Sequence, residues 1–192
     1  MNLPNKLTVL RVILVPVLML FLCVPMGLSD TLVRVIAAVL FALTSLTDML
    51  DGKIARKYNM VTDFGKLMDP LADKFLVFGA MLGILVYCAD LRPIFVWAAA
   101  IVMLRELAVT SLRLLAASQS GAVIAAAWLG KVKTVTQVVC ILCVILEPVI
   151  LPFPLFTQYH LLSYVTIAAM IVMTIWSGVE YFTAYGKNIN MK

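Results

Sequence analysis

The chain has 192 residues, of which 64% are hydrophobic and only 13% are charged, and its formal net charge is +5. A soluble globular domain has about 45–50% apolar and about 25% charged residues, so this composition excludes an ordinary soluble protein. The basic residues lie at the ends of apolar segments rather than on a polar face, which excludes nucleic acid as the expected partner.

Long apolar runs follow one another along the chain, and each has about the 20 residues that a helix needs to cross a membrane. The alternation of apolar and polar residues that is typical of a transmembrane barrel is absent from the sequence. We therefore predict an all-α integral membrane protein with a single domain over residues 1–192 and a short cytoplasmic N-terminal segment. The six predicted spans cover residues 8–28, 32–55, 68–88, 93–117, 122–151 and 160–184.

The positions of the lysines and arginines predict how the chain is oriented. If the N-terminus is cytoplasmic, only Arg34 and Arg92 fall on the outer side, and Arg105 lies inside the fourth span. The other cations then share the cytoplasmic side: Lys6, Arg11, Lys53, Arg56, Lys57, Lys66, Lys74, Arg113, Lys131, Lys133, Lys187 and Lys192. Cytoplasmic loops carry an excess of positive residues, so both termini are predicted to be cytoplasmic. The same cations suit anionic membrane lipids or a phosphorylated substrate.

Aspartates gather where the second predicted span ends, in the segment TDMLDGKIAR, and where the third begins. Asp48 and Asp51 are three residues apart and Asp69 and Asp73 are four apart, so each pair shares one face of a helix. The polar segment KYNMVTDFGK between the pairs predicts a tight cytoplasmic connection, in which Asp63 is solvated. We therefore expect four carboxylates to face one volume at the cytoplasmic membrane boundary.

This carboxylate cluster predicts a metal site. At membrane depth each unpaired aspartate costs about 2.5–3.5 kcal/mol, and the four negative charges also repel one another. Two divalent cations balance that charge, and oxygen ligands without Cys or His favour Mg²⁺ or Mn²⁺ over zinc. We expect two such ions, held by Asp48, Asp51, Asp69 and Asp73.

Residues beside the aspartates favour phosphate chemistry. Gly52 and Ala55 are small where a substrate must approach the helix closely, and Arg56 can pair with a diphosphate.

Two other classes of membrane protein also use acidic residues inside the membrane. An intramembrane prenyltransferase needs a second aspartate motif, but Asp90 is the only aspartate that follows Asp73. The acidic residues of a divalent-cation transporter would be spread across the depth of the bilayer, whereas these aspartates gather at one face.

The spacing D-x2-D-G-x2-A-R-x8-G-x3-D-x3-D, residues 48–73, resembles the signature of the CDP-alcohol phosphotransferase family at all eight fixed positions. The resemblance implies that an acceptor hydroxyl attacks the β-phosphorus of a CDP-linked donor and that CMP leaves. It implies metal binding by the aspartates, with Asp73 also the general base for the hydroxyl. It further implies that the donor contacts include Gly52, Ala55, Arg56 and Gly65, and that the protein is a homodimer in a bacterial cell membrane.

Three further segments, PNKLTVLR, RELAVTSLR and GKVKTVTQ, resemble those of bacterial family members whose acceptor is sn-glycerol 3-phosphate. This resemblance implies that Asn5 and Thr8 line the nucleotide pocket. It also implies that the acceptor phosphate is bound by Arg105, Arg113, Lys131 and Lys133. The donor would then be CDP-diacylglycerol and the product phosphatidylglycerol phosphate, and inositol phosphate is the closest alternative acceptor.

Each of these segments also has a structural interpretation. Asn5 is a residue type that caps helices. Arg105 has possible internal partners in Glu106, Glu147 and Glu180, because a cation inside an apolar span needs one. Lys131 and Lys133 are placed where positive residues anchor a span at the cytoplasmic surface.

Overall fold

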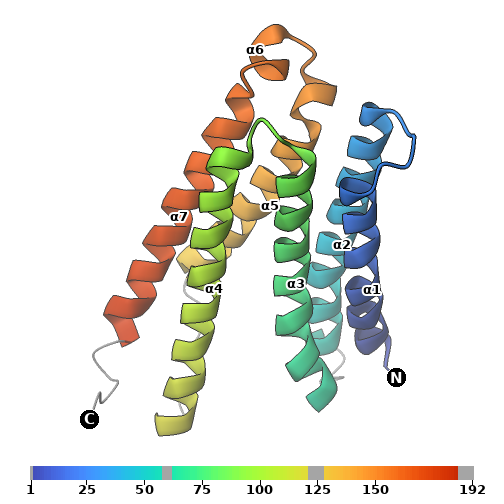
Figure 1. The fold of residues 1–192 in the computed structure, drawn as a ribbon. Coiled ribbons are helices and arrows are strands. Elements are labelled where there is room, and N and C mark those ends of the chain that lie inside the picture. Colours follow the sequence, from blue (N-terminus) through green and yellow to red (C-terminus); the bar gives the residue numbers. More distant parts are fainter. Residues whose placement is uncertain (1, 58–61, 121–127, 186–192) are drawn as a thin grey trace.

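The computed structural model describes residues 2–57, 62–120 and 128–185, and its description of side chains excludes residues 3–4, 48–57, 63, 66, 114, 116–120 and 185. The regular secondary structure of the described chain is entirely α-helical (Figure 1). The helices are α1 (Leu3–Cys23), α2 (Asp30–Lys57), α3 (Asp63–Tyr87), α4 (Arg92–Ser120), α5 (Trp128–Ile150), α6 (Pro154–Thr157) and α7 (Leu161–Tyr185).

Six of these helices are long and apolar enough to cross a membrane, which confirms the predicted all-α, six-span architecture. Within each span's apolar window only 28–44% of the residues are buried inside the protein. Large apolar side chains such as Leu104, Leu107 and Trp176 are instead exposed on the outside of the bundle. An outer surface of this kind is stable in hydrocarbon and not in water, so the protein is a multi-pass membrane protein.

The long helices pack around one apolar core. Helix α1 lies against α2 and α3, α5 lies against α2 and α7, and α4 bridges α3 and α7. Buried residues from all six long helices, among them Val15, Phe41, Ile84, Phe95 and Ile141, belong to a single hydrophobic cluster. Helix α1 begins and α7 ends at the same end of the bundle, and the turn of α6 lies at the opposite end (Figure 1).

The first helix ends earlier than its predicted span of 8–28. Helix α1 stops at Cys23, and Pro25 and Gly27 follow it. Gly27 has a φ of +70°, which a residue without a Cβ adopts without strain. The apolar run continues past this point, and for that reason hydropathy alone placed the boundary too late.

The third helix starts earlier than predicted, so the interpretation of Asp63 as a loop residue was wrong. Asp63 is the first residue of α3, and Thr62 caps the helix by accepting a hydrogen bond from the backbone N–H of Gly65 at 3.1 Å. A threonine in this position satisfies one of the donors that every helix start leaves unpaired. The predicted start of the fifth span, residue 122, lies outside the described residues, and α5 is described from Trp128.

Two glycines on α3 allow it to lie very close to α1. A Cβ added to Gly79 would lie 2.5 Å from Cγ1 of Val15, and one added to Gly83 would lie 2.7 Å from Cδ1 of Leu22. Small residues four apart permit close helix packing in membranes. The Gly79–Gly83 face is therefore used within the chain, for the pairing that holds the start of α3 beside the start of α1.

Glu147 joins α5 to α7 at the end of the bundle opposite the chain's N-terminus. Its carboxylate accepts hydrogen bonds from the backbone N–H groups of Leu162 at 2.7 Å and Ser163 at 2.9 Å, and also from the Ser163 hydroxyl. The carboxylate thus caps the first turn of α7 from another helix. Glu147 is occupied there and is not the partner of Arg105, one of the alternatives that the sequence left open.

Candidate active site

The predicted carboxylates lie at the end of the bundle where α2 ends and α3 begins (Figure 1). Asp69 and Asp73 are one helical turn apart on α3, which packs against α2. The remaining residues of the motif before α3 belong to the last turns of α2, and their side chains lie outside the described residues: Asp48, Asp51, Gly52, Ala55 and Arg56. The structure therefore describes the α3 half of the predicted site.

Asp69 is connected to the first turns of α1. The hydroxyl of Thr8, a fully buried residue, donates a hydrogen bond to Oδ1 of Asp69 at 2.7 Å. The Thr62 hydroxyl donates to Oδ1 of Asn5 at 2.9 Å. Asn5 therefore binds the cap of α3 and does not cap its own helix, whose N-cap is Asn2. These contacts hold α1 and α3 in register beside Asp69.

Gly65 lies at the centre of this polar cluster. A Cβ added to it would lie 3.3 Å from Oδ1 of Asn5, 3.3 Å from Oγ1 of Thr62 and 3.6 Å from Oδ2 of Asp69. Any side chain at this position would enter a space already lined by oxygen atoms. Within the described residues, the glycine thus leaves space beside Oδ2 of Asp69, the carboxylate oxygen that Thr8 does not contact.

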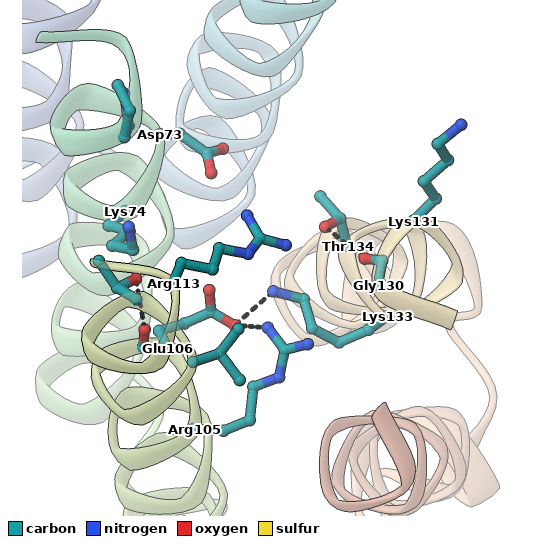
Figure 2. A pocket seen from close by; sticks show the side chains of 12 residues that line it. Asp73, Lys74, Arg105, Glu106, Arg113, Gly130, Lys131, Lys133 and Thr134 are labelled. Atoms are coloured by element: carbon teal, nitrogen blue, oxygen red, sulfur yellow. Dashed lines mark hydrogen bonds and ion pairs between the residues drawn. The ribbon is translucent and has the colours of Figure 1, made fainter. Parts of the chain in front are cut away.

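Asp73 opens onto a cavity of about 260 Å³ between α3, α4 and α5 (Figure 2). This volume is below the roughly 300–1,000 Å³ of pockets for drug-sized ligands, so the cavity suits a small molecule. Its charged lining has five cations and two carboxylates, a formal net charge of +3: Lys74, Arg105, Arg113, Lys131, Lys133, Asp73 and Glu106. All four residues expected to bind the acceptor phosphate line this cavity, together with the candidate base.

Glu106 pairs with two of the cavity's cations. Its Oε1 accepts from Nη1 of Arg105 at 3.0 Å and from Nζ of Lys133 (Figure 2). The internal pairing considered for Arg105 is thus present, but it uses only one of the guanidinium nitrogens. Nε and Nη2 of Arg105 are buried and have no hydrogen-bond partner in the described part of the chain. Buried donors of this kind are normally satisfied, so these two nitrogens are an exception among the buried polar atoms.

Tyr181 on α7 contacts both Arg105 and Arg113 of the cavity. Nη2 of Arg113 donates to the Tyr181 hydroxyl, and the guanidinium carbons of Arg113 and Arg105 lie 4.9 Å and 5.6 Å from the centre of its ring. An aromatic ring at these distances attracts a cation and limits its freedom. Tyr181 is 1% exposed, and neither its spacing nor its sequence context predicted this role.

The residues present fit a magnesium-type ion in their chemistry. Asp69 and Asp73 offer carboxylate oxygens, and Gly65 leaves room beside one of them. Among the described residues no group of three or more acidic, His or Cys side chains could hold a metal. The two other candidate ligands, Asp48 and Asp51, are outside the described side chains.

The sequence is similar to one protein family and to several named proteins over nearly its whole length. The family model described as CDP-alcohol phosphatidyltransferase matches residues 1–176. A protein of Bacillus subtilis named CDP-diacylglycerol–glycerol-3-phosphate 3-phosphatidyltransferase is 39% identical, over 95% of this chain and 94% of its own. A Salmonella choleraesuis protein of the same name is 32% identical over the same shares. A probable phosphatidylglycerophosphate synthase of Mycobacterium tuberculosis is 40% identical, over 94% of this chain and 79% of its own. The chain belongs to the CDP-alcohol phosphatidyltransferase family.

Proposed function

We propose that this protein transfers the phosphatidyl group of CDP-diacylglycerol to sn-glycerol 3-phosphate and releases phosphatidylglycerol phosphate and CMP. The observation that carries the proposal is the cavity in which Asp73 and the four acceptor-binding candidates come together. The relatives that bear this activity in their names support it, because they are similar to the chain over nearly its whole length.

The acceptor occupies the cationic cavity in this proposal. Its phosphate binds Arg105 together with Arg113, Lys131 and Lys133, because guanidinium groups pair with phosphate in two parallel hydrogen bonds. A net charge of +3 around a small cavity favours a doubly charged phosphomonoester over an uncharged alcohol such as serine or choline. The hydroxyl that attacks the donor then lies on the side of Asp73.

The donor lies on the other side of Asp73, against α1, α2 and the start of α3. Asn5, Thr8 and Gly65 form the described wall of this proposed nucleotide site, and the contacts of Thr8 with Asp69 and of Asn5 with Thr62 fix its shape. Gly52, Ala55 and Arg56 complete it from α2. The diacylglycerol part remains in the membrane, so donor and acceptor reach α3 from different phases and meet at its two aspartates.

Two Mg²⁺ or Mn²⁺ ions would be held by Asp48, Asp51, Asp69 and Asp73. When bound, such ions neutralise the diphosphate and stabilise the attacking and leaving oxygens of an in-line displacement. Thr8 orients the Asp69 carboxylate through its hydrogen bond. The carboxylate of Asp73 accepts the proton of the attacking hydroxyl, a transfer that requires a base within hydrogen-bond reach.

The reaction balances without a further reactant. The acceptor's primary hydroxyl oxygen forms a bond to the β-phosphorus of the donor, and the bond from that phosphorus to the bridging oxygen breaks. CMP leaves with the bridging oxygen, and the hydroxyl proton passes to Asp73 and then to water.

The site end of the bundle faces the cytoplasm of a bacterial cell in this proposal, with both termini on that side. The excess of lysine and arginine at this end supports the orientation. Reporter domains fused to the C-terminus and to the turn after α5 test it. A cytoplasmic reporter should be active at the C-terminus and inactive at the turn, and the reverse pattern would contradict the orientation.

The protein is further proposed to form a homodimer, as its family resemblance implies. The contact must use a surface other than Gly79 and Gly83, because α1 covers that face. Cross-linking in native membranes followed by mass measurement in detergent tests the dimer. A monomer under both conditions would refute it.

A single assay tests the activity. Full-length protein in detergent, supplied with CDP-diacylglycerol, sn-glycerol 3-phosphate and Mg²⁺, should release CMP and form a lipid with two phosphates. EDTA should abolish the release, and added Mg²⁺ should restore it. Replacing the acceptor by inositol phosphate, or the donor by a prenyl diphosphate, tests the other candidates. Turnover with those substrates and none with sn-glycerol 3-phosphate would overturn the proposal.

A further inference from the structure

Glu106 is an unexpected residue for a cavity that is to bind a phosphate. Its side chain is only 13% exposed, and it lines the cavity beside Arg105 and Lys133. A carboxylate here repels a phosphate dianion and removes part of the positive charge that attracts it. A cavity evolved to bind phosphate alone would be better served by a neutral residue.

The two oxygens of Glu106 have different surroundings. Oε1 accepts from both Arg105 and Lys133. Oε2 has no hydrogen bond or ion pair within the described part of the chain. In Figure 2 the carboxylate oxygen without a dashed line points away from both of these cations. The carboxylate is therefore held in place through one oxygen and offers the other as an acceptor.

A ligand that satisfies this oxygen must donate a hydrogen bond. Phosphate at neutral pH has no strong donor to offer, so the donor must be a hydroxyl on the carbon skeleton of the ligand. An acceptor of the proposed kind has two hydroxyls, and the attacking one faces Asp73. The hydroxyl that remains is the secondary one, next to the carbon that carries the phosphate.

We infer that Glu106 is a specificity-determining residue, whose Oε2 accepts a hydrogen bond from the secondary hydroxyl of a polyol phosphate. The inference rests on the proposed function and adds the residue that selects the acceptor's carbon skeleton. Arg105 and Lys133 then have two roles, since they bind the phosphate and also hold the Glu106 carboxylate in position. A site that hydrogen-bonds a substrate hydroxyl rejects the analogue that lacks it, because a polar atom of the site, here Oε2 of Glu106, is then left without its hydrogen bond.

The matched substrate is 3-hydroxypropyl phosphate, which keeps the phosphate and the attacking hydroxyl of sn-glycerol 3-phosphate and lacks only the secondary hydroxyl. CMP release by the full-length protein, with CDP-diacylglycerol and Mg²⁺, gives kcat/KM for each acceptor. The wild type should prefer sn-glycerol 3-phosphate by about 10- to 100-fold, the range expected for a hydrogen bond to a charged group. The preference, a ratio, is insensitive to the amount of active protein.

Two variants and a control assign the preference to Glu106. Glu106→Met should bring the ratio close to one. Glu106→Met combined with Lys133→Met should do the same without leaving a buried lysine unpaired, which protects the test against misfolding of the single variant. Lys131→Met removes a cation of the same cavity that has no contact with Glu106 in the described chain, and it should lower both activities while keeping the ratio.

The outcomes separate the possible roles. If both acceptors lose activity equally in the Glu106 variants and the ratio persists, Glu106 only positions Arg105 and Lys133, and the inference is wrong. A wild type that uses both acceptors equally well would overturn the inference alone. Failure of the wild type to release CMP from either acceptor would overturn the proposed function and the inference together.

Discussion

Thr8 donates a hydrogen bond to Oδ1 of Asp69 at 2.7 Å, across 61 positions of sequence. This contact joins the first turns of α1 to the turn of α3 that carries the proposed metal ligands. Because one carboxylate oxygen is held by the hydroxyl, the other is directed toward the space beside Gly65. An outer residue that orients a metal ligand in this way affects the metal site without touching the ion.

Replacing Thr8 by valine should therefore weaken the response to Mg²⁺. Valine keeps the shape of the side chain but cannot donate to Asp69, and loss of such an outer contact costs about 10- to 100-fold in metal affinity or activity. The measurement is the Mg²⁺ concentration that gives half-maximal CMP release. Thr8→Ser retains a hydroxyl and should stay close to the wild type. An unchanged Mg²⁺ requirement in Thr8→Val would mean that the bond only holds α1 against α3.

Replacing Asp73 by asparagine should lower kcat by about 10²- to 10⁴-fold, the contribution usual for a positioned general base. Asparagine has nearly the same size but cannot take the proton of the hydroxyl. The KM for sn-glycerol 3-phosphate should change little, because its phosphate binds other residues of the cavity. Initial rates over a range of acceptor concentrations separate the two parameters. Near-normal kcat in the variant would exclude Asp73 as the base.

Arg105 should act mainly on acceptor binding. Its Nε and Nη2 are buried without partners in the described chain, and a lysine cannot reproduce the planar fork that pairs with phosphate. Arg105→Lys should raise the KM for sn-glycerol 3-phosphate by about tenfold, the loss expected for one hydrogen bond to a charged group. The KM for CDP-diacylglycerol serves as the internal control and should not move. A rise in both would assign Arg105 a general structural role.

The sequence predicts the helices well because span length and hydropathy are local properties. The six spans appear close to their predicted positions. The errors lie at helix ends where a capping or turn residue sets the boundary. Thr62 starts α3 before its apolar run begins, and Pro25 with Gly27 follow α1 before its apolar run ends. Such boundaries depend on capping and turn geometry, to which hydropathy is insensitive.

The sequence predicts which charged residues gather in the candidate site, but not which side chains form hydrogen bonds and ion pairs there. Its cations and aspartates are conspicuous in an apolar chain, and their spacing resembles a known signature. Glu106, Tyr181 and Thr62 could not be found in this way, because each acts through contacts with a residue at least 27 positions away. Only Glu106 had been considered, as one of three possible partners of Arg105.

Gly79 should be sensitive to the smallest side chain. A Cβ there would lie 2.5 Å from Cγ1 of Val15, so α1 and α3 would have to separate, and overpacking of this kind costs about 1–3 kcal/mol. Gly79→Ala should lower the melting temperature in detergent. Gly130→Ala is the matched control, because among the described residues its Cβ would meet only Tyr181, at 3.8 Å. Equal melting temperatures for the two variants would show that α1 and α3 adjust without cost.

Glu147 should contribute to stability and not to catalysis. Its carboxylate accepts from two backbone N–H groups at the start of α7, at 2.7 Å and 2.9 Å, and each buried donor left unpaired costs about 1–3 kcal/mol. Glu147→Ala should therefore lower the melting temperature markedly, and Glu147→Gln less, because the amide keeps one acceptor oxygen. Both variants should retain the wild-type KM for sn-glycerol 3-phosphate at low temperature, since Glu147 lies at the end of the bundle opposite the cavity. Because Glu147 caps the end of α7 that is far from the cavity, its loss can affect the cavity only if α7, which carries Tyr181, unfolds. A changed KM with an unchanged melting temperature would therefore contradict this assignment.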